Sequence, residues 1–171
     1  MKISSEIPIH NLKDLGYLND YPFIINIYRD IPEYREYYIK ECVEKDLSFL
    51  DSGFFENWEN GTSFDTSLSA IEEGVKIFKP KYVFSEEVFG DADLTILKSK
   101  EYKKYFNGDV KIASCVHGST YDEYKRCFYE LQKTADLIAF SHKFAFHNEI
   151  IELCPSLKCD NIYTELSLVR V

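Results

Sequence analysis

Residues 51–56 are the segment of this chain whose types and spacing are best suited to chemistry. They read Asp-Ser-Gly-Phe-Phe-Glu and follow the apolar run 47–50 without a spacer. Ligands of parallel α/β proteins bind at the carboxyl ends of strands, so a carboxylate there is a candidate general base or ligand anchor. We therefore expect Asp51 to act in a site. Its alternative role is to cap the turn through the amides of Ser52 and Gly53.

Similar polar clusters follow later apolar runs and extend this candidate site. Of the neighbouring carboxylates Glu86 and Glu87, only one is expected to enter a site, because adjacent strand residues point to opposite faces, and we favour Glu87. His117 is either a hydrogen-bond donor to a ligand or a capping histidine. The candidate residues are Asp51, Ser52, Gly53, Phe55, Glu56, Glu87, Asp91, His117 and Gly118, with further clusters at 141–143 and Glu165. We expect these residues to converge on one rim of the sheet; the alternative is that they are polar only because loops generally are.

The chain is unusually aromatic, and this affects how the candidate site is interpreted. It contains 13 Tyr and 13 Phe. Phe54, Phe55 and Trp58 could stack on a flat ring, and packing in the core is the equally weighted alternative for them.

The elements that must position these residues follow from hydrophobic periodicity. Apolar, β-branched or aromatic runs predict strands, and amphipathic segments between most of them predict helices. Expected strands are 23–28, 47–50, 82–85, 110–116, 137–140 and, more weakly, 162–169. Expected helices are 33–45, 68–78, 93–106 and 121–134. Thr66 or Ser67 is expected to cap the second helix, and Ser119 or Thr120 the last, with Glu123 forming a capping box with Thr120.

The alternation of strands and helices predicts parallel βα units in an α/β fold. From residue 47 onward, strands start about every 25 to 35 residues, a spacing typical of right-handed βα crossovers. The chain shows neither a GxGxxG nor a P-loop pattern, which favours a TIM-type (β/α)8 barrel over a nucleotide-binding open sheet. A full barrel takes ~250 residues, so we expect one domain over residues 1–171 that forms an incomplete barrel of about five or six units.

Composition limits the partners and the compartment. A net charge of −9 and a pI near 5.0 argue against a broad phosphate-binding surface. Five cysteines without a CxxC pair indicate a reducing, cytoplasmic setting, and no apolar run approaches a membrane span. Cys154 and Cys159 with His147 match no standard zinc spacing, so we expect no metal and no cofactor.

Three strand-end segments resemble motifs of the tRNA-guanine transglycosylase superfamily, especially its shorter phage and bacterial relatives of the queuine tRNA-ribosyltransferase type. The segments are 50–56 (Leu-Asp-Ser-Gly-Phe-Phe-Glu), 80–91 (Pro-Lys-Tyr-Val-Phe-Ser-Glu-Glu-Val-Phe-Gly-Asp) and 114–120 (Ser-Cys-Val-His-Gly-Ser-Thr). Family members are (β/α)8 barrels that exchange 7-deazaguanine-type bases in RNA or DNA. The resemblance implies that Asp51 is the base or base-anchoring carboxylate and that Phe55 stacks on the purine. It places Glu87 where an aspartate reads the base edge, and His117 where a glutamine is usual.

The resemblance also implies that part of the machinery is absent. The family's nucleophilic aspartate, and the zinc site of its tRNA enzymes, lie on later strands than those expected here. We therefore expect a second chain or a homo-oligomer to complete the barrel, with a nucleic acid or a nucleobase as the substrate.

Three functions are consistent with these residues. The first is a glycosyltransferase-like protein that recognises a (7-deaza)guanine-type base and needs a second chain for exchange. The second is a non-catalytic binding or structural relative within a larger assembly. The third is an unrelated metal-dependent hydrolase that uses Asp51, Glu87 and His117.

Overall fold

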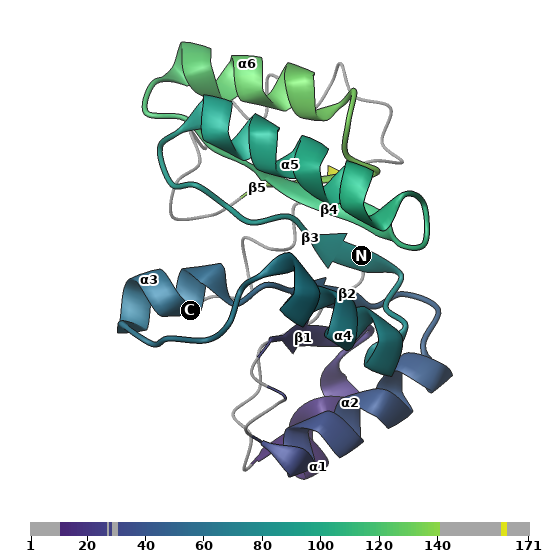
Figure 1. Cartoon of the computed structure of the whole chain (residues 1–171). Coiled ribbons are helices and arrows are strands. Elements are labelled where there is room, and N and C mark those ends of the chain that lie inside the picture. Colours follow the sequence, from purple (N-terminus) through teal and green to yellow (C-terminus); the bar gives the residue numbers. More distant parts are fainter. Residues whose placement is uncertain (1–10, 27, 29–30, 141–161, 164–171) are drawn as a thin grey trace. The chain divides into compact units, whose positions relative to one another are not determined.

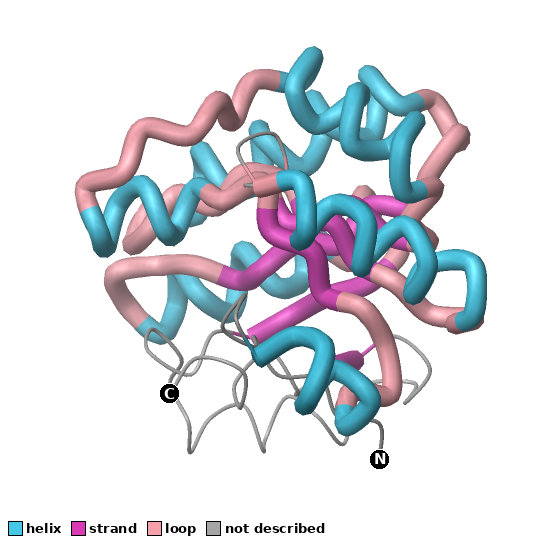
Figure 2. Tube along the Cα trace, turned by 90° about the horizontal axis from the view of Figure 1, so that it is seen from below, coloured by secondary structure: helices cyan, strands magenta, loops and turns pink. Residues whose placement is uncertain are grey.

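The computed structural model describes residues 11–26, 28, 31–140 and 162–163, and these form two compact units. Unit 1 spans Met1–Phe84 and unit 2 spans Ser85–Val169. Strands and helices alternate along the chain, as the magenta and cyan segments of Figure 2 show. Within the described residues, every helix is too short or too polar to cross a membrane.

Unit 1 contains parallel strands that pair in chain order. β1 (Phe23–Ile25) pairs with β2 (Phe49–Asp51), which pairs with β3 (Tyr82–Phe84). Its helical elements are α1 (Leu12–Leu15), the 3-10 turn η2 (Gly16–Leu18), α2 (Pro32–Glu44), α3 (Phe54–Asn60) and α4 (Leu68–Phe78). The order β1–α2–β2–α3–α4–β3 is the parallel βα repeat that the sequence predicts, with α3 as an added short helix (Figure 1).

The two faces of the unit 1 sheet differ in what they contact. Leu50 packs against α4, so closely that a Cβ on Gly74 would lie 2.8 Å from the Leu50 Cδ2 atom. Side chains alternate along a strand, so Phe49 and Asp51 point to the opposite face. There Phe49 meets the rings of Phe23 and Phe84 at centroid distances of 6.1 and 5.7 Å. The carboxylate therefore stands at the end of an aromatic sheet face.

Unit 2 repeats the same arrangement, and its strands β4 and β5 are longer than those of unit 1. Its helices are α5 (Ala92–Phe106) and α6 (Tyr121–Leu131), and its strands are β4 (Lys111–Val116), β5 (Leu137–Phe140) and β6 (Ile162–Tyr163). β4 and β6 each pair with β5 in parallel. α5 and α6 lie side by side over β4 and β5 (Figure 1), and between them the buried cluster includes Ile96, Val116, Phe128 and Phe140.

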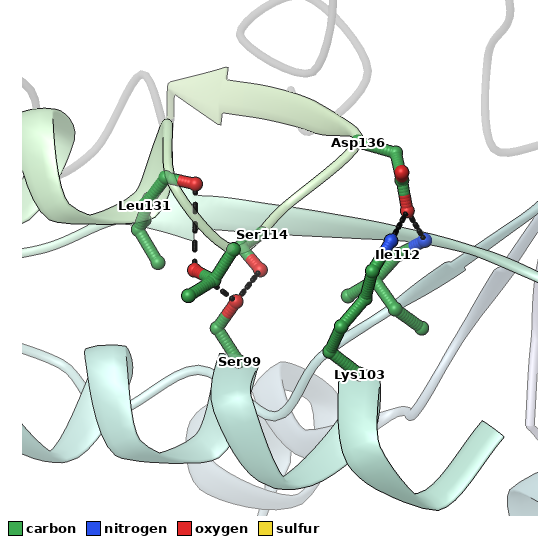
Figure 3. Close-up of polar contacts among 7 residues, drawn as sticks. Ser99, Lys103, Ile112, Ser114, Leu131 and Asp136 are labelled. Carbon is green, nitrogen blue, oxygen red and sulfur yellow. Dashed lines mark hydrogen bonds and ion pairs between the residues drawn. The ribbon is translucent and has the colours of Figure 1, made fainter. Parts of the chain in front are cut away.

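A chain of buried hydroxyls joins this helix layer to β4. The Ser114 Oγ lies 2.8 Å from the Ser85 Oγ. It donates to the Ser99 Oγ at 2.9 Å, as Figure 3 shows. The Thr134 Oγ1 continues the chain 3.2 Å from Ser99. Each hydroxyl thus satisfies another in a region where an unpaired polar group would be costly. These bonds orient Ser114 toward α5, and so orient its neighbour Cys115 toward the other face of the strand.

Most predicted elements are confirmed, and their bounds shift by a few residues. The strands expected at 23–28 and 47–50 are β1 and β2, and the helix expected at 68–78 is α4. Ser67 is the cap of α4, since its side chain accepts from the Ala70 amide. Of the weak strand at 162–169, β6 covers the first two residues and the remainder lies outside the described residues. The single domain stays a prediction.

Three short helical elements were not predicted, namely α1, η2 and α3. α3 begins directly after Gly53, whose φ of 76° is in the left-handed region that favours glycine. A left-handed residue lets β2 turn into a helix within two residues, without the loop that we expected after a strand. The signal for it was the turn sequence Asp-Ser-Gly.

Candidate functional site

The carboxyl end of β2 forms a rigid turn around Asp51. Its side chain is buried, and the Asp51 Oδ1 accepts a hydrogen bond from the Gly53 amide at 2.9 Å. The Ser52 Oγ accepts one from the Phe54 amide at 3.2 Å. Asp51 therefore does cap the turn through Gly53, which was the alternative role in the sequence analysis. The same bond fixes the direction of the carboxylate, so capping and ligand anchoring are compatible.

Asn26 lies beside this turn and was not among the residues expected from the sequence. It follows Ile25, the β1 residue in register with Asp51, and its Cβ lies 3.9 Å from a Cβ built on Gly53. The Asn26 Nδ2 donates to the Asp65 carbonyl at 2.6 Å, which sets the orientation of the amide. Among the described residues, the buried Asn26 Oδ1 has no hydrogen-bond partner. The sequence feature that could have identified Asn26 is its position as an amide residue within an otherwise apolar and aromatic run.

The residues after the turn lie on α3. Phe55 and Glu56 fall within this helix, and their side chains are outside the described part of the structure. Trp58 is 57% exposed, which makes core packing the wrong alternative for that ring. Phe64 folds back to the turn, with its ring 3.6 Å from a Cβ built on Gly53. Asn57 holds Phe64 there by bonding both its amide and its carbonyl at 2.8 Å.

In unit 2 the structure brings Glu87, Cys115 and His117 together. The His117 Nε2 lies 3.2 Å from the Glu87 Oε2, and one ligand atom of each of the three residues lies within 4.8 Å of the others. Cys115 and His117 are two residues apart, so they project to one side of β4 and its extension. Both are buried, and the Glu87 side chain is 12% exposed. This set combines a nitrogen, a sulfur and an oxygen donor.

The neighbouring carboxylates Glu86 and Glu87 point in different directions, and the role of Glu87 in a base site stays a prediction. Glu86 points elsewhere and forms an ion pair with Lys98 at 3.1 Å. Burial works to lower the pKa of Lys98, but the bonds and charges of Glu86 and Glu101 outweigh it and raise that pKa. Glu86 therefore neutralises a lysine of α5, and Glu87 alone of the two reaches the histidine.

The loops that carry Glu87 and His117 are tied to each other. The Ser119 Oγ donates to the Gly90 carbonyl at 2.6 Å, and the Ser119 amide donates to the Glu123 Oε2 at 3.0 Å. The expected capping box is confirmed on its Thr120 side, where the Glu123 amide donates to the Thr120 Oγ1 at 3.3 Å. The Glu123 carboxylate bonds one residue earlier than expected, at Ser119, and so fixes the loop as well as the helix.

The remaining candidates in unit 2 have structural contacts of their own. The Asp91 Oδ1 accepts from the Leu94 amide at 2.9 Å and caps α5. Gly118 packs against the first turn of α6, where a Cβ would lie 2.5 Å from the Tyr124 nitrogen. Cys127 lies behind His117, and burial raises its pKa to about 11 although the His117 backbone hydrogen bond acts to lower it.

The predicted site residues thus fall into two groups. Asp51, Ser52 and Gly53 belong to unit 1, and Glu87 and His117 belong to unit 2. The clusters expected at 141–143 and Glu165 lie outside the described residues. The common rim stays a prediction, while the structure adds Asn26 to the first group and Cys115 to the second.

No family model matches this chain, and the curated proteins include no match to it. The geometry of the two groups is therefore the basis for assigning a function.

Proposed function

We propose that this chain recognises a guanine-type base through the unit 1 group of Asp51 and Asn26, as a transglycosylase-like protein whose βα repeats belong to a TIM-type barrel. The observation that carries the proposal is the buried Asp51 carboxylate at the end of β2, with the buried Asn26 Oδ1 next to its turn. Both groups are hydrogen-bond acceptors. A ligand that fits them must present N–H donors.

Guanine-type bases present such donors along one edge. N1–H and the exocyclic amino group lie side by side in the ring plane, and carboxylates and amide oxygens accept from them. Adenine presents an acceptor at N1, which a carboxylate would repel. A buried acceptor without a donor costs about 1–3 kcal/mol, so a ligand donor to the Asn26 Oδ1 would recover that cost. Guanine and 7-deazaguanine share this edge, and the proposal covers both.

Aromatic rings close to the turn supply flat contacts for such a base. Phe64 lies against the turn, and Phe54 opens α3 with a half-buried side chain. The resemblance assigns stacking to Phe55, the next residue along α3. Such rings stabilise a bound base through offset stacking as well as through the apolar area that they bury.

The proposal assigns recognition, not the exchange step, to the residues of unit 1. Covalent exchange requires a nucleophile that displaces the base from its sugar. The resemblance places that aspartate on later strands, and we expect a second chain to supply it. The acidic charge of −9 disfavours unaided binding of a nucleic-acid duplex, so a free base or an unpaired nucleotide is the favoured ligand.

Equilibrium dialysis of the purified chain with labelled guanine, 7-deazaguanine and adenine tests the proposal. We expect both guanine-type bases to bind and adenine to be rejected. Asp51→Asn keeps an oxygen for the Gly53 amide but removes the charge. A hydrogen bond to a charged group contributes about 1.5–3 kcal/mol, so we expect affinity to fall about 10- to 100-fold. Asp109→Asn, at an exposed aspartate of a turn, is the matched control.

Two results would contradict the proposal. One is equal binding of guanine and adenine, and the other is unchanged guanine affinity in Asp51→Asn. Incorporation of labelled guanine into tRNA or DNA, by the chain alone or with a co-purified second chain, then distinguishes exchange from binding. Binding without incorporation in either case favours the non-catalytic relative.

A further inference from the structure

We propose that Glu87, Cys115 and His117 form a binding site for a zinc-class divalent transition metal ion in unit 2. It uses none of the base-recognition residues of unit 1, and the proposal does not depend on them. From the sequence we expected no metal, although Glu87 and His117 were named in the metal-dependent alternative, and the resemblance placed both residues at base-reading positions. The third neighbour, a cysteine, changes that interpretation because a thiolate is a strong ligand for zinc and a poor partner for a base edge.

The nitrogen and oxygen donors are spaced as a tetrahedral site requires. Two metal bonds of about 2.0–2.1 Å to nitrogen and oxygen place those atoms about 3.3 Å apart at the tetrahedral angle. The His117 Nε2 and Glu87 Oε2 are 3.2 Å apart. A zinc–sulfur bond of about 2.3 Å would place the sulfur about 3.6 Å from either atom. The three ligand atoms lie within 4.8 Å of one another, so the Cys115 sulfur needs to move by at most about 1.2 Å to reach that distance.

The surroundings hold this set in place. The ring of Phe89 packs edge-on against the His117 ring at a centroid distance of 5.2 Å, which restricts its rotation. The Ser119–Gly90 hydrogen bond ties the loop after β4 to the loop that carries Glu87. Cys115 lies within β4, whose pairing with β5 fixes its backbone. Ligands held by packing and by outer hydrogen bonds are the ones that bind metal tightly.

The number of ligands indicates the type of site. Structural zinc sites use four protein ligands, whereas three protein ligands leave a position for water or substrate. Within the described residues, Glu87, Cys115 and His117 are the group of His, Cys, Asp or Glu residues whose donor atoms converge in this way. The proposed ion would therefore keep an open coordination position, at which a bound water is acidified.

Cobalt titration of the full chain, after removal of metal with a chelator, tests the site. Tetrahedral Co2+ bound to a thiolate gives a charge-transfer band in the near ultraviolet and intense visible bands. We expect the band to saturate at one Co2+ per chain and to disappear when Zn2+ displaces it. Cys115→Ser should abolish the thiolate band. Removing a residue that only hydrogen-bonds to a metal ligand already lowers metal affinity about 10- to 100-fold. Glu87→Gln and His117→Gln each remove a ligand itself and should lower Co2+ affinity by at least about 100-fold.

Matched cysteine variants keep the test specific. Cys42→Ser should retain the thiolate band. The double variant Cys154→Ser/Cys159→Ser should retain it as well, and it tests whether those two cysteines, and not Cys115, supply the thiolate ligand. Far-ultraviolet circular dichroism of each metal-free variant shows whether it folds. If a substitution at the buried Cys115 or His117 prevents folding, Glu87→Gln, at a partly exposed residue, tests the site instead. An absent band in the wild-type chain, a band that survives in Cys115→Ser, or loss of the band only in the double variant would overturn the proposal.

Discussion

Replacement of Gly118 by alanine separates a packing role from a ligand-binding role at this position. Gly118 was a candidate site residue in the sequence, whereas the structure places it against the first turn of α6. An added Cβ would lie 2.5 Å from the Tyr124 nitrogen and 2.9 Å from the Glu123 carbonyl carbon. These are backbone atoms, so no side-chain rotation relieves the contact.

The size of the effect follows from that geometry. The contact of 2.5 Å falls about 0.9 Å short of the 3.4 Å at which ordinary van der Waals contact begins. Either α6 or the His117 loop must move by that amount. α6 is anchored by Tyr124, which is fully buried, and by the Thr120 cap. Overpacking of this kind costs about 1–3 kcal/mol, which corresponds to about 2–12 °C in melting temperature for a chain of this length.

Urea and thermal denaturation followed by far-ultraviolet circular dichroism measure this cost. Gly74→Ala is the matched control, because its Cβ would also be close to a neighbour, at 2.8 Å, but that neighbour is the end of the Leu50 side chain. Leu50 can rotate, and alanine gains about 1 kcal/mol of helix propensity at this position, so we expect a smaller loss or none. Gly118→Ala should also weaken Co2+ binding, because it displaces His117. A free energy of unfolding within about 0.5 kcal/mol of the wild type would refute the packing argument.

Two further predictions concern the pH dependence of stability. Burial acts to raise the pKa of Asp136, but hydrogen bonds from Lys103 and from the Ile112 amide (Figure 3), with the charges of Lys103 and Lys111, hold that pKa below its usual value. Because this pKa is lower in the folded state, the Asp136 carboxylate stabilises the fold at pH values above the unfolded-state pKa of about 3.9, and this stabilisation is lost as the pH falls through the folded-state pKa. In urea denaturation from pH 6 to pH 2, Asp136→Asn should therefore lose less unfolding free energy than the wild type. Burial raises the pKa of Cys42 to about 12, so the folded state keeps a proton that the unfolded state releases above about pH 8.5. Stability should fall from there toward pH 12, and an equally steep alkaline loss in Cys42→Ala would contradict the assignment.

The repeat and the turn are the parts that the sequence determined by itself. Apolar runs alternating with amphipathic segments set the order of strands and helices, because burial of an apolar face dictates the period of each element. The sequence narrowed each of two helix caps to a pair of neighbouring hydroxyl residues, since such side chains satisfy the first amides of a helix, and the structure selects Ser67 and Thr120. Asp51 was identifiable because a carboxylate rarely follows a buried strand without a local bond, and it has one to Gly53.

The partners of the site residues were decided only by the tertiary structure. Asn26 is 25 residues from Asp51 in the sequence, and the pairing of β1 with β2 brings its amide next to the Asp51 turn. Cys115 appeared in the sequence as one of several cysteines without a spacing pattern. Its position two residues before His117, and the loop that returns Glu87 to that histidine, make it part of a donor set. Local propensity acts over a few residues, whereas these contacts join segments about 25–30 residues apart, and only the folded chain brings such segments together.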